Sequence, residues 1–208
     1  MPWNRCKYAI GVFAIVLTFG YGSQSLAAIT GTDHDFSTQG FSGGEICVVC
    51  HTPHFSDTTV VDAPLWNHEL TTQSFTPYSS ATLDAAVGQP QGISKLCLSC
   101  HDGSVAVDAF GGKPGGSFFV PPQDQVGTDL SNDHPISFVF DASLASTDGS
   151  LFDPTTKSSG LGGTIDQDML FSGNLECASC HDVHDSGFPE FLVKSNAGSG
   201  LCLTCHDK

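Results

Sequence analysis

Cysteine pairs that are each followed directly by a histidine are the residues of this chain best suited to do chemistry. The pattern Cys-x-x-Cys-His occurs at residues 47–51, 97–101, 177–181 and 202–206, and these four segments hold eight of the nine cysteines. They are called here the first, second, third and fourth motifs. A thiol pair at this spacing can form a disulfide, contribute half of a zinc site or tether a haem group.

The histidine separates these three possibilities. A disulfide needs no particular neighbour, and a zinc ribbon does not require a histidine directly after its second cysteine. Haem attachment does require one, because two thioethers hold the porphyrin and the next residue ligates the iron. The sequence therefore predicts four covalently bound haem c groups. The predicted attachment residues are Cys47, Cys50, Cys97, Cys100, Cys177, Cys180, Cys202 and Cys205, and the predicted first axial ligands are His51, His101, His181 and His206.

Five further histidines are candidates for the second axial position of these irons. They are His34, His54, His68, His134 and His184. Beyond residue 27 the other strong candidate for an iron ligand is Met169, which we interpret as a core residue because methionine fills irregular apolar space. The pattern thus predicts irons with two histidine ligands each, in the low-spin state and at low potential.

The motifs are arranged in two similar halves. Each half contains an upstream histidine, a CxxCHxxH segment and a closing LCLxCHD segment, in the same order. We therefore predict a first dihaem half over residues 28–115 and a second over residues 116–208, after a signal segment at 1–27.

This repeat also suggests which histidine serves which motif. The second histidine of each CxxCHxxH segment is expected to reach the next motif, so that His54 serves the second motif and His184 the fourth. His34 and His134 are then assigned to the first and third motifs, and His68 is the surplus histidine.

The sequence predicts little regular secondary structure. Each motif is expected on a short helix, because positions i, i+3 and i+4 share one helical face and can address one porphyrin. A Gly/Pro-rich connector at 111–123 and a loop-like stretch at 141–163 interrupt the chain, and only residues 136–140 alternate as a strand would. The expected fold is mostly irregular coil, with little β-structure, wrapped around four haems and unfolded without them.

Residues 1–27 have the features of an export signal. Arg5 and Lys7 form a basic start, an apolar stretch follows, and Ser25-Leu26-Ala27 resembles a cleavage site. The apolar stretch is short for a membrane span, and Cys6 within the basic start is read as incidental. We expect an exported protein with no membrane span after cleavage, located outside the cell or at its surface, with the periplasm as the alternative.

The net charge of the exported chain disfavours some classes of binding partner. Removal of residues 1–27 takes away two of the seven cationic residues and changes the formal net charge from −15 to −17. Nucleic acids and anionic membranes bind through clusters of cationic side chains, so both are disfavoured. The same charge keeps an exported protein soluble, and it also attracts cationic partners or metal ions.

The chain resembles a known family, the doubled-CxxCH multihaem cytochromes. The segments "HDFS", "CHTPH", "PLWNH", "SKLCLSCHDGSVAVD", "LSNDHPISF", "ECASCHDVH" and "SNAGSGLCLTCHDK" are similar to those of OmcE-type tetrahaem cytochromes of metal-reducing bacteria. The resemblance extends over about residues 30–208. It implies an extracellular filament of many copies, in which one of the five further histidines ligates a haem of the next copy. His34 is our expected choice, with His68 filling the vacancy.

Three functions follow as alternatives. The leading prediction is an electron-transfer protein without substrate chemistry, acting as a conducting filament subunit whose partners are other copies, other redox proteins or metal-oxide acceptors. A soluble periplasmic shuttle is the second. The third is a multihaem reductase, which needs an iron with an open axial position. Three features disfavour the reductase. They are the surplus of histidines, the absence of a motif with lysine in place of histidine, and the lack of any arginine beyond residue 27 that could hold an anionic substrate.

Overall fold

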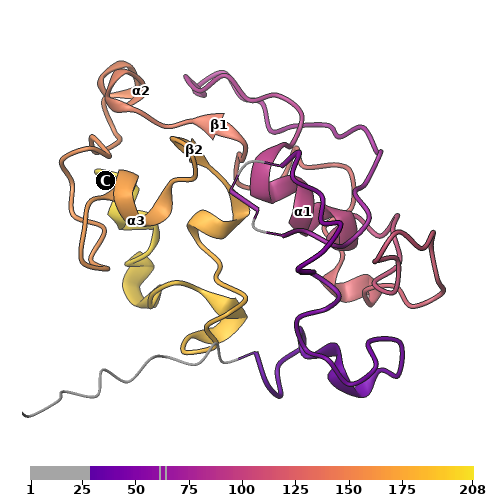
Figure 1. Cartoon of the computed structure of the whole chain (residues 1–208). Helices are drawn as coiled ribbons and strands as arrows, with labels where there is room; N and C mark the ends of the chain where they lie inside the picture. The colour runs from indigo at the N-terminus through magenta and orange to yellow at the C-terminus, as the bar shows by residue number, and fades with distance from the viewer. Residues whose placement is uncertain (1–28, 61, 64) are drawn as a thin grey trace, which may run out of the picture.

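The computed structural model describes residues 29–60, 62–63 and 65–208, most of them in turns and irregular segments (Figure 1). The predicted export signal, with Cys6, and Pro64 lie outside the described residues. The α-helices are α1 (Gly92–His101), α2 (Ala142–Asp148), α3 (Ile165–Met169) and α4 (Cys202–Cys205), and the strands are β1 (Phe138–Val139) and β2 (Asn174–Leu175). Short 3-10 turns are η1 (Phe36–Thr38), η2 (Pro122–Asp124), η3 (Cys177–Ser179), η4 (Pro189–Phe191) and η5 (Ala197–Ser199). The predicted fold class, coil with short helices and little β-structure, is confirmed.

Helical backbone is found at three of the four motifs. The second motif ends α1, the third begins with η3, and the fourth contains α4. The first motif forms only a single turn, in which the His51 amide donates to the Cys47 carbonyl oxygen at 2.8 Å. Glycines at 43 and 44 precede this turn and Pro53 follows it, so the chain has no room to extend a helix on either side. The predicted helix at the first motif is therefore wrong.

The predicted strand at 136–140 is present in a shorter form. Strand β1 pairs antiparallel with β2, with Phe138 opposite Leu175. Ser137 has a positive φ of 57°, so the extended conformation begins only after it.

The predicted loop at 141–163 is partly wrong, because α2 lies within it. The Asp141 side chain accepts a hydrogen bond from the Leu144 amide and caps the start of α2, and Gly149 ends the helix at a φ of 70°. These two caps allow a seven-residue helix whose composition alone predicts a loop.

The main apolar core belongs to the second half of the sequence. Its buried residues are Phe138, Phe140, Ala145, Ile165, Met169, Leu170, Leu175 and Leu201. Met169 is 3 % exposed in this core, which agrees with its interpretation as a core residue. Cys180 and Cys205 pack against the same cluster, so the third and fourth motifs rest on it. Figure 1 shows β1, β2 and α3 on the side of the molecule that also holds the C-terminus.

Smaller contacts join the first half to residues 118 and 130 of the second half. A second cluster joins Phe75, Leu98 and Leu130, which places α1 against two irregular segments. Aromatic rings link the N-terminal segment to the loop after α1, and Phe41 lies 5.3 Å from Phe118 between ring centres. Among the helices of the described residues, none is long and apolar enough to cross a membrane.

Candidate haem-binding site

Three of the four motif histidines each face a second histidine. The ring centres are 6.0 Å apart for His34 and His101, 6.1 Å for His51 and His184, and 6.3 Å for His134 and His206. A histidine nitrogen lies about 2 Å from a bound metal ion, so two imidazoles on opposite sides of one ion have ring centres roughly 6 Å apart. The three pairs therefore have the spacing of two axial ligands of one iron.

These pairings differ from the ones predicted from the repeat. His34 lies beside the second motif and not the first, His184 beside the first and not the fourth, and His134 beside the fourth and not the third. The prediction treated the halves as two separate units. The structure instead packs them against each other, so that His184 reaches the opposite half to meet His51.

Backbone carbonyl groups orient several of these imidazoles. The Nδ1 atoms of His101, His181 and His134 lie 2.8, 2.7 and 2.8 Å from the carbonyl oxygens of Asp124, Glu190 and Pro135. A metal-ligating histidine commonly donates its second ring N–H to such a group. The arrangement fixes the ring and leaves Nε2 with its lone pair, as an iron ligand requires.

Burial keeps two of the paired histidines in the form that binds metal. Burial lowers the pKa of His34, and the neighbouring His101 lowers it further. Burial and the neighbouring His134 lower the pKa of His206 in the same way. A neutral imidazole has a free lone pair, so both rings are ready to ligate iron at neutral pH.

His68 has a different environment from the paired histidines. It is 3 % exposed, and its Nδ1 and Nε2 atoms lie 2.8 and 3.0 Å from the carbonyl oxygens of Glu69 and Ala106. A neutral imidazole donates from one nitrogen only, so at most one of these two contacts is a hydrogen bond. The ring faces no other imidazole among the described residues, and its Nε2 atom lies 3.6 Å from the Cys100 sulfur of the second motif.

Like His68, the predicted ligands His54 and His181 have no imidazole opposite them among the described residues. His54 is exposed, and within the described part of the chain its ring has no hydrogen bond or ring contact. His181 is also exposed and makes its ring hydrogen bond to the Glu190 carbonyl. His134 and His184 are exposed as well, but each lies beside a motif histidine, whereas His54 and His181 do not lie beside another histidine in the described part of the chain.

The cysteines of the motifs differ in depth. Cys47 and Cys202, each the first cysteine of its motif, are exposed. The second cysteines lie deeper, and burial raises the pKa to about 11 for Cys50, Cys180 and Cys205 and to about 12 for Cys100. These cysteines are the residues that would form thioether bonds to a porphyrin.

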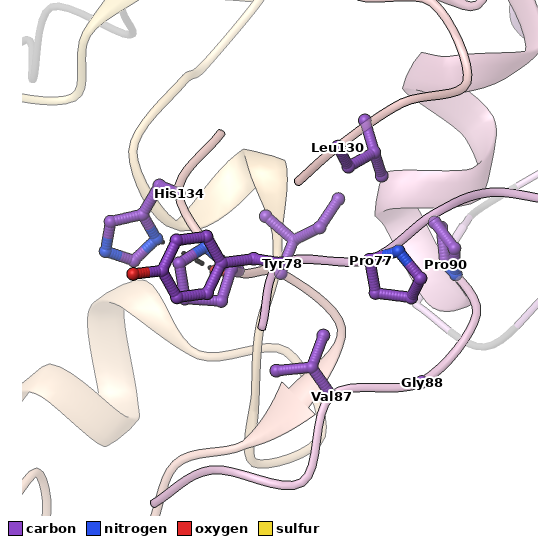
Figure 2. Close-up of a pocket in the computed structure, with 9 residues that line it drawn as sticks. Pro77, Tyr78, Val87, Gly88, Pro90, Leu130 and His134 are labelled. Atoms are coloured by element: carbon purple, nitrogen blue, oxygen red, sulfur yellow. Dashed lines mark hydrogen bonds between the residues drawn. The ribbon is translucent and has the colours of Figure 1, made fainter. Parts of the chain in front are cut away.

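An apolar hollow lies beside His134. It is lined by Pro77, Tyr78, Val87, Gly88, Pro90, Leu130, His134, Pro135 and Ile136. Figure 2 shows the Tyr78 ring and His134 at one end of this hollow and Pro77 and Pro90 at the other. Apolar walls beside His134, a predicted axial ligand, would suit the neighbourhood of a porphyrin.

Two charged residues near the motifs were missed from the sequence. Glu176 directly precedes Cys177 and is 2 % exposed, and Lys194 contacts Thr204 inside the fourth motif. The position of Glu176 directly before a motif cysteine is the one signal in the sequence that pointed to it. Nothing in the sequence near Lys194 marks it.

The comparisons with known proteins agree with this chemistry over the C-terminal segment. Residues 171–208, which contain the third and fourth motifs, match the family model described as doubled CXXCH motif. A comparison of the chain with curated proteins found no match. The chain thus carries a doubled CXXCH motif at 171–208, of the kind found in multihaem c-type cytochromes, and its CXXCH motifs indicate covalently bound haem c.

Proposed function

We propose that this protein is a tetrahaem c-type cytochrome that transfers electrons, with two histidine ligands on every iron, and that it acts as a subunit of an extracellular conducting filament. The observation that carries the proposal is the set of three imidazole pairs with ring centres 6.0 to 6.3 Å apart, each containing a motif histidine. Haem supplies an iron that cycles between two oxidation states while the protein holds it in place.

Closed axial positions favour electron transfer over substrate chemistry. An iron with imidazoles on both sides has no free position for a substrate, and reductases of this kind need one. The imidazole pairs at the first, second and fourth motifs support closed axial positions on three irons of a single chain. Multihaem c-type cytochromes generally transfer electrons, in agreement with this arrangement.

The second axial position at the third motif is the reason to propose a filament. His181 of the third motif is exposed, and His54 is exposed on another part of the surface. A second copy of the chain that presents His54 to His181 would complete the last iron, and repetition of this contact would build an open chain of copies. This assigns the shared ligand to His54 and not to His34, because His34 already faces His101.

The surface around His54 fits a contact of this kind. Phe55, the next residue, has a relative exposure of 105 %, and Leu65 nearby in the sequence is 49 % exposed. Large apolar side chains at such exposure mark interaction sites when they are grouped. Phe55 also has a positive φ of 59°, a conformation uncommon for a bulky residue. The chain therefore holds an aromatic ring outward directly beside the free histidine.

Two measurements test the proposal together. Intact mass of the mature protein should show four added haem groups, and fewer than four would overturn the tetrahaem assignment. Electron microscopy of material from the cell surface should show filaments, and dispersed particles alone would retain electron transfer but reject the filament.

A soluble shuttle is the second candidate, and the charge of the chain favours it. Copies with a net charge of −17 after signal removal repel one another, which opposes assembly at low ionic strength. Carbon monoxide binding separates the two candidates. In a filament every iron should resist carbon monoxide, whereas a dispersed single copy should bind it at the third motif. Binding at several haems in the assembled state would favour a reductase.

A further inference from the structure

Two charged side chains are buried or half-buried against different motifs, and they have opposite sign. Glu176 lies between the second and third motifs, and Lys194 lies against the fourth. Neither forms an ion pair in the part of the chain that the structure describes. Each charge is instead held by neutral hydrogen-bonding groups, so its field acts on its surroundings without cancellation by a counter-charge.

Glu176 is a buried carboxylate with several donors. Its Oε2 atom accepts hydrogen bonds from the Ser94 amide at 3.2 Å and the Ser137 hydroxyl at 2.9 Å, and from the Ser94 hydroxyl. The Ser94 hydroxyl also accepts from the Cys177 amide at 2.9 Å. Burial of a carboxylate is costly unless such donors compensate it. The structure thus holds this group in place from α1, from the residue before β1 and from η3.

The location of Glu176 is the contact between two haem-binding motifs. Ser94 lies in α1, which carries Cys97, and Glu176 is followed by Cys177. A hydrogen bond between the Cys97 and Cys177 thiols raises the pKa of Cys97 and lowers that of Cys177. The attachment sulfurs of the second and third motifs are therefore neighbours, and the carboxylate lies beside both motifs.

Lys194 makes the corresponding contact at the fourth motif. Its Nζ atom donates to the Ser159 carbonyl oxygen at 2.6 Å and to the Thr204 hydroxyl at 3.0 Å. Thr204 lies between the two cysteines of the fourth motif and is 5 % exposed. Lys194 also acts against the burial that raises the pKa of Cys205, which places its positive charge within electrostatic range of that motif.

The sign of a nearby charge decides which oxidation state of an iron is favoured. The ferric state carries one more positive charge than the ferrous state. A neighbouring carboxylate therefore stabilises the ferric state and lowers the reduction potential, and a neighbouring ammonium group raises it. Both effects are strongest where water is excluded.

We infer that Glu176 lowers the reduction potentials of the haems on the second and third motifs and that Lys194 raises the potential of the haem on the fourth, so that electrons settle preferentially at the fourth motif. This inference rests on the proposed tetrahaem function. The four haems would then differ in reduction potential, and the haem on the fourth motif would have the highest.

The first test is a spectroelectrochemical titration of the purified haem-loaded protein with Glu176→Gln. Glutamine keeps the size of the side chain and removes its charge. The part of the titration curve that belongs to two of the haems should shift to higher potential, and the rest should stay in place. The matched control is Glu45→Gln, an exposed glutamate two residues before the first cysteine of the first motif, which should leave the curve unchanged. A curve equal to that of the unmodified protein for Glu176→Gln would overturn the role of the carboxylate.

The second test uses Lys194→Gln, with the exposed Lys113→Gln as control. The part of the curve that belongs to one haem should shift to lower potential, and only in the Lys194 variant. An unshifted curve would overturn the role of the ammonium group.

The unmodified protein provides a test that needs no variant. Its titration should spread over more than one step, and the spread should persist at high salt, because salt screens buried charges much less than exposed ones. A single step for all haems would overturn the inference. Four haems by intact mass together with a single step would reject this inference alone, whereas fewer than four haems would reject the proposed function.

Discussion

The two CxxCHxxH segments have the same spacing of cysteines and histidines, but their second histidines, His54 and His184, have different neighbours. In the third motif the chain folds so that His184 lies 6.1 Å from His51, ring centre to ring centre, with the planes inclined by 24°. In the first motif His54 is exposed beside Phe55, which is exposed as well. A duplicated pattern thus yields one histidine that lies beside a motif histidine of the other half and one that does not.

The residues between the paired histidines account for part of this difference. Asp182 accepts a hydrogen bond from the His184 amide at 2.9 Å, and its carboxylate lies 3.3 Å from the His184 ring nitrogen Nδ1. The corresponding residue in the first motif is Thr52, whose hydroxyl likewise accepts from the His54 amide, at 3.4 Å, but which has no carboxylate to contact the ring. The contact between the Asp182 carboxylate and the His184 ring is therefore the local difference between the two segments.

The largest expected effect is that of His184→Ala, which removes the second histidine that lies beside His51. The iron of the first motif should lose one axial ligand, and one additional haem should become high-spin and bind carbon monoxide. Electron paramagnetic resonance and carbon monoxide titration of dispersed protein measure this change. An unchanged spin state would mean that His184 is not an iron ligand.

The next largest effect is that of His54→Ala, which removes the second histidine of the first CxxCHxxH segment. Dispersed protein should keep the spectrum of the unmodified protein, because no imidazole of the described residues faces His54. Filaments should no longer form, as judged by electron microscopy. A new high-spin haem in the dispersed variant would contradict the proposed role and return His54 to a ligand within its own chain.

A smaller effect is expected for His68→Phe, a histidine that neither segment uses. The variant loses the contacts from the ring to the Glu69 and Ala106 carbonyl oxygens. Loss of a donor to a buried acceptor costs about 1–3 kcal/mol in the free energy of unfolding. Chemical denaturation measures this loss, while the haem spectrum should remain low-spin to the same extent. A high-spin haem would show that His68 is a ligand after all.

The smallest effect is that of Phe55→Ser, which keeps His54 but removes the exposed ring next to it. Assembly should weaken by up to about 1.5–3 kcal/mol, the value of burying one such side chain, and the stability of the dispersed protein should not fall. The concentration dependence of filament formation measures the first and thermal unfolding the second. A stability loss without an assembly defect would place Phe55 in the fold and not at an interface.

The sequence predicted the chemistry of this chain better than its geometry. The cysteine and histidine spacing predicts haem attachment because covalent chemistry fixes which residue types must be adjacent. The choice of pairs was not predictable, because it depends on how the two halves pack. Phe191 shows this, since it lies 4.9 Å from the His34 ring although the two residues come from opposite ends of the described chain.

The buried charged residues could not be predicted from the sequence for a related reason. Glu176 has no partner of opposite sign in sequence or in the described structure, and its donors Ser94 and Ser137 come from distant segments. Helix α2 was also missed, because its caps outweigh a composition rich in serine, threonine and aspartate. Short elements held by caps and single hydrogen bonds leave no periodic pattern to read.

The pairing of His51 with His184 has a mechanical consequence if both hold one iron. The bond would act as a clamp between residues far apart in the sequence, and such a clamp restricts the freedom of the unfolded chain as other long-range cross-links do. A coil with few helices would be expected to extend easily when pulled from its two ends. With this clamp intact, the stretch from residue 51 to residue 184 could not lengthen until metal coordination broke, so rigidity under tension would come from the iron and not from the backbone.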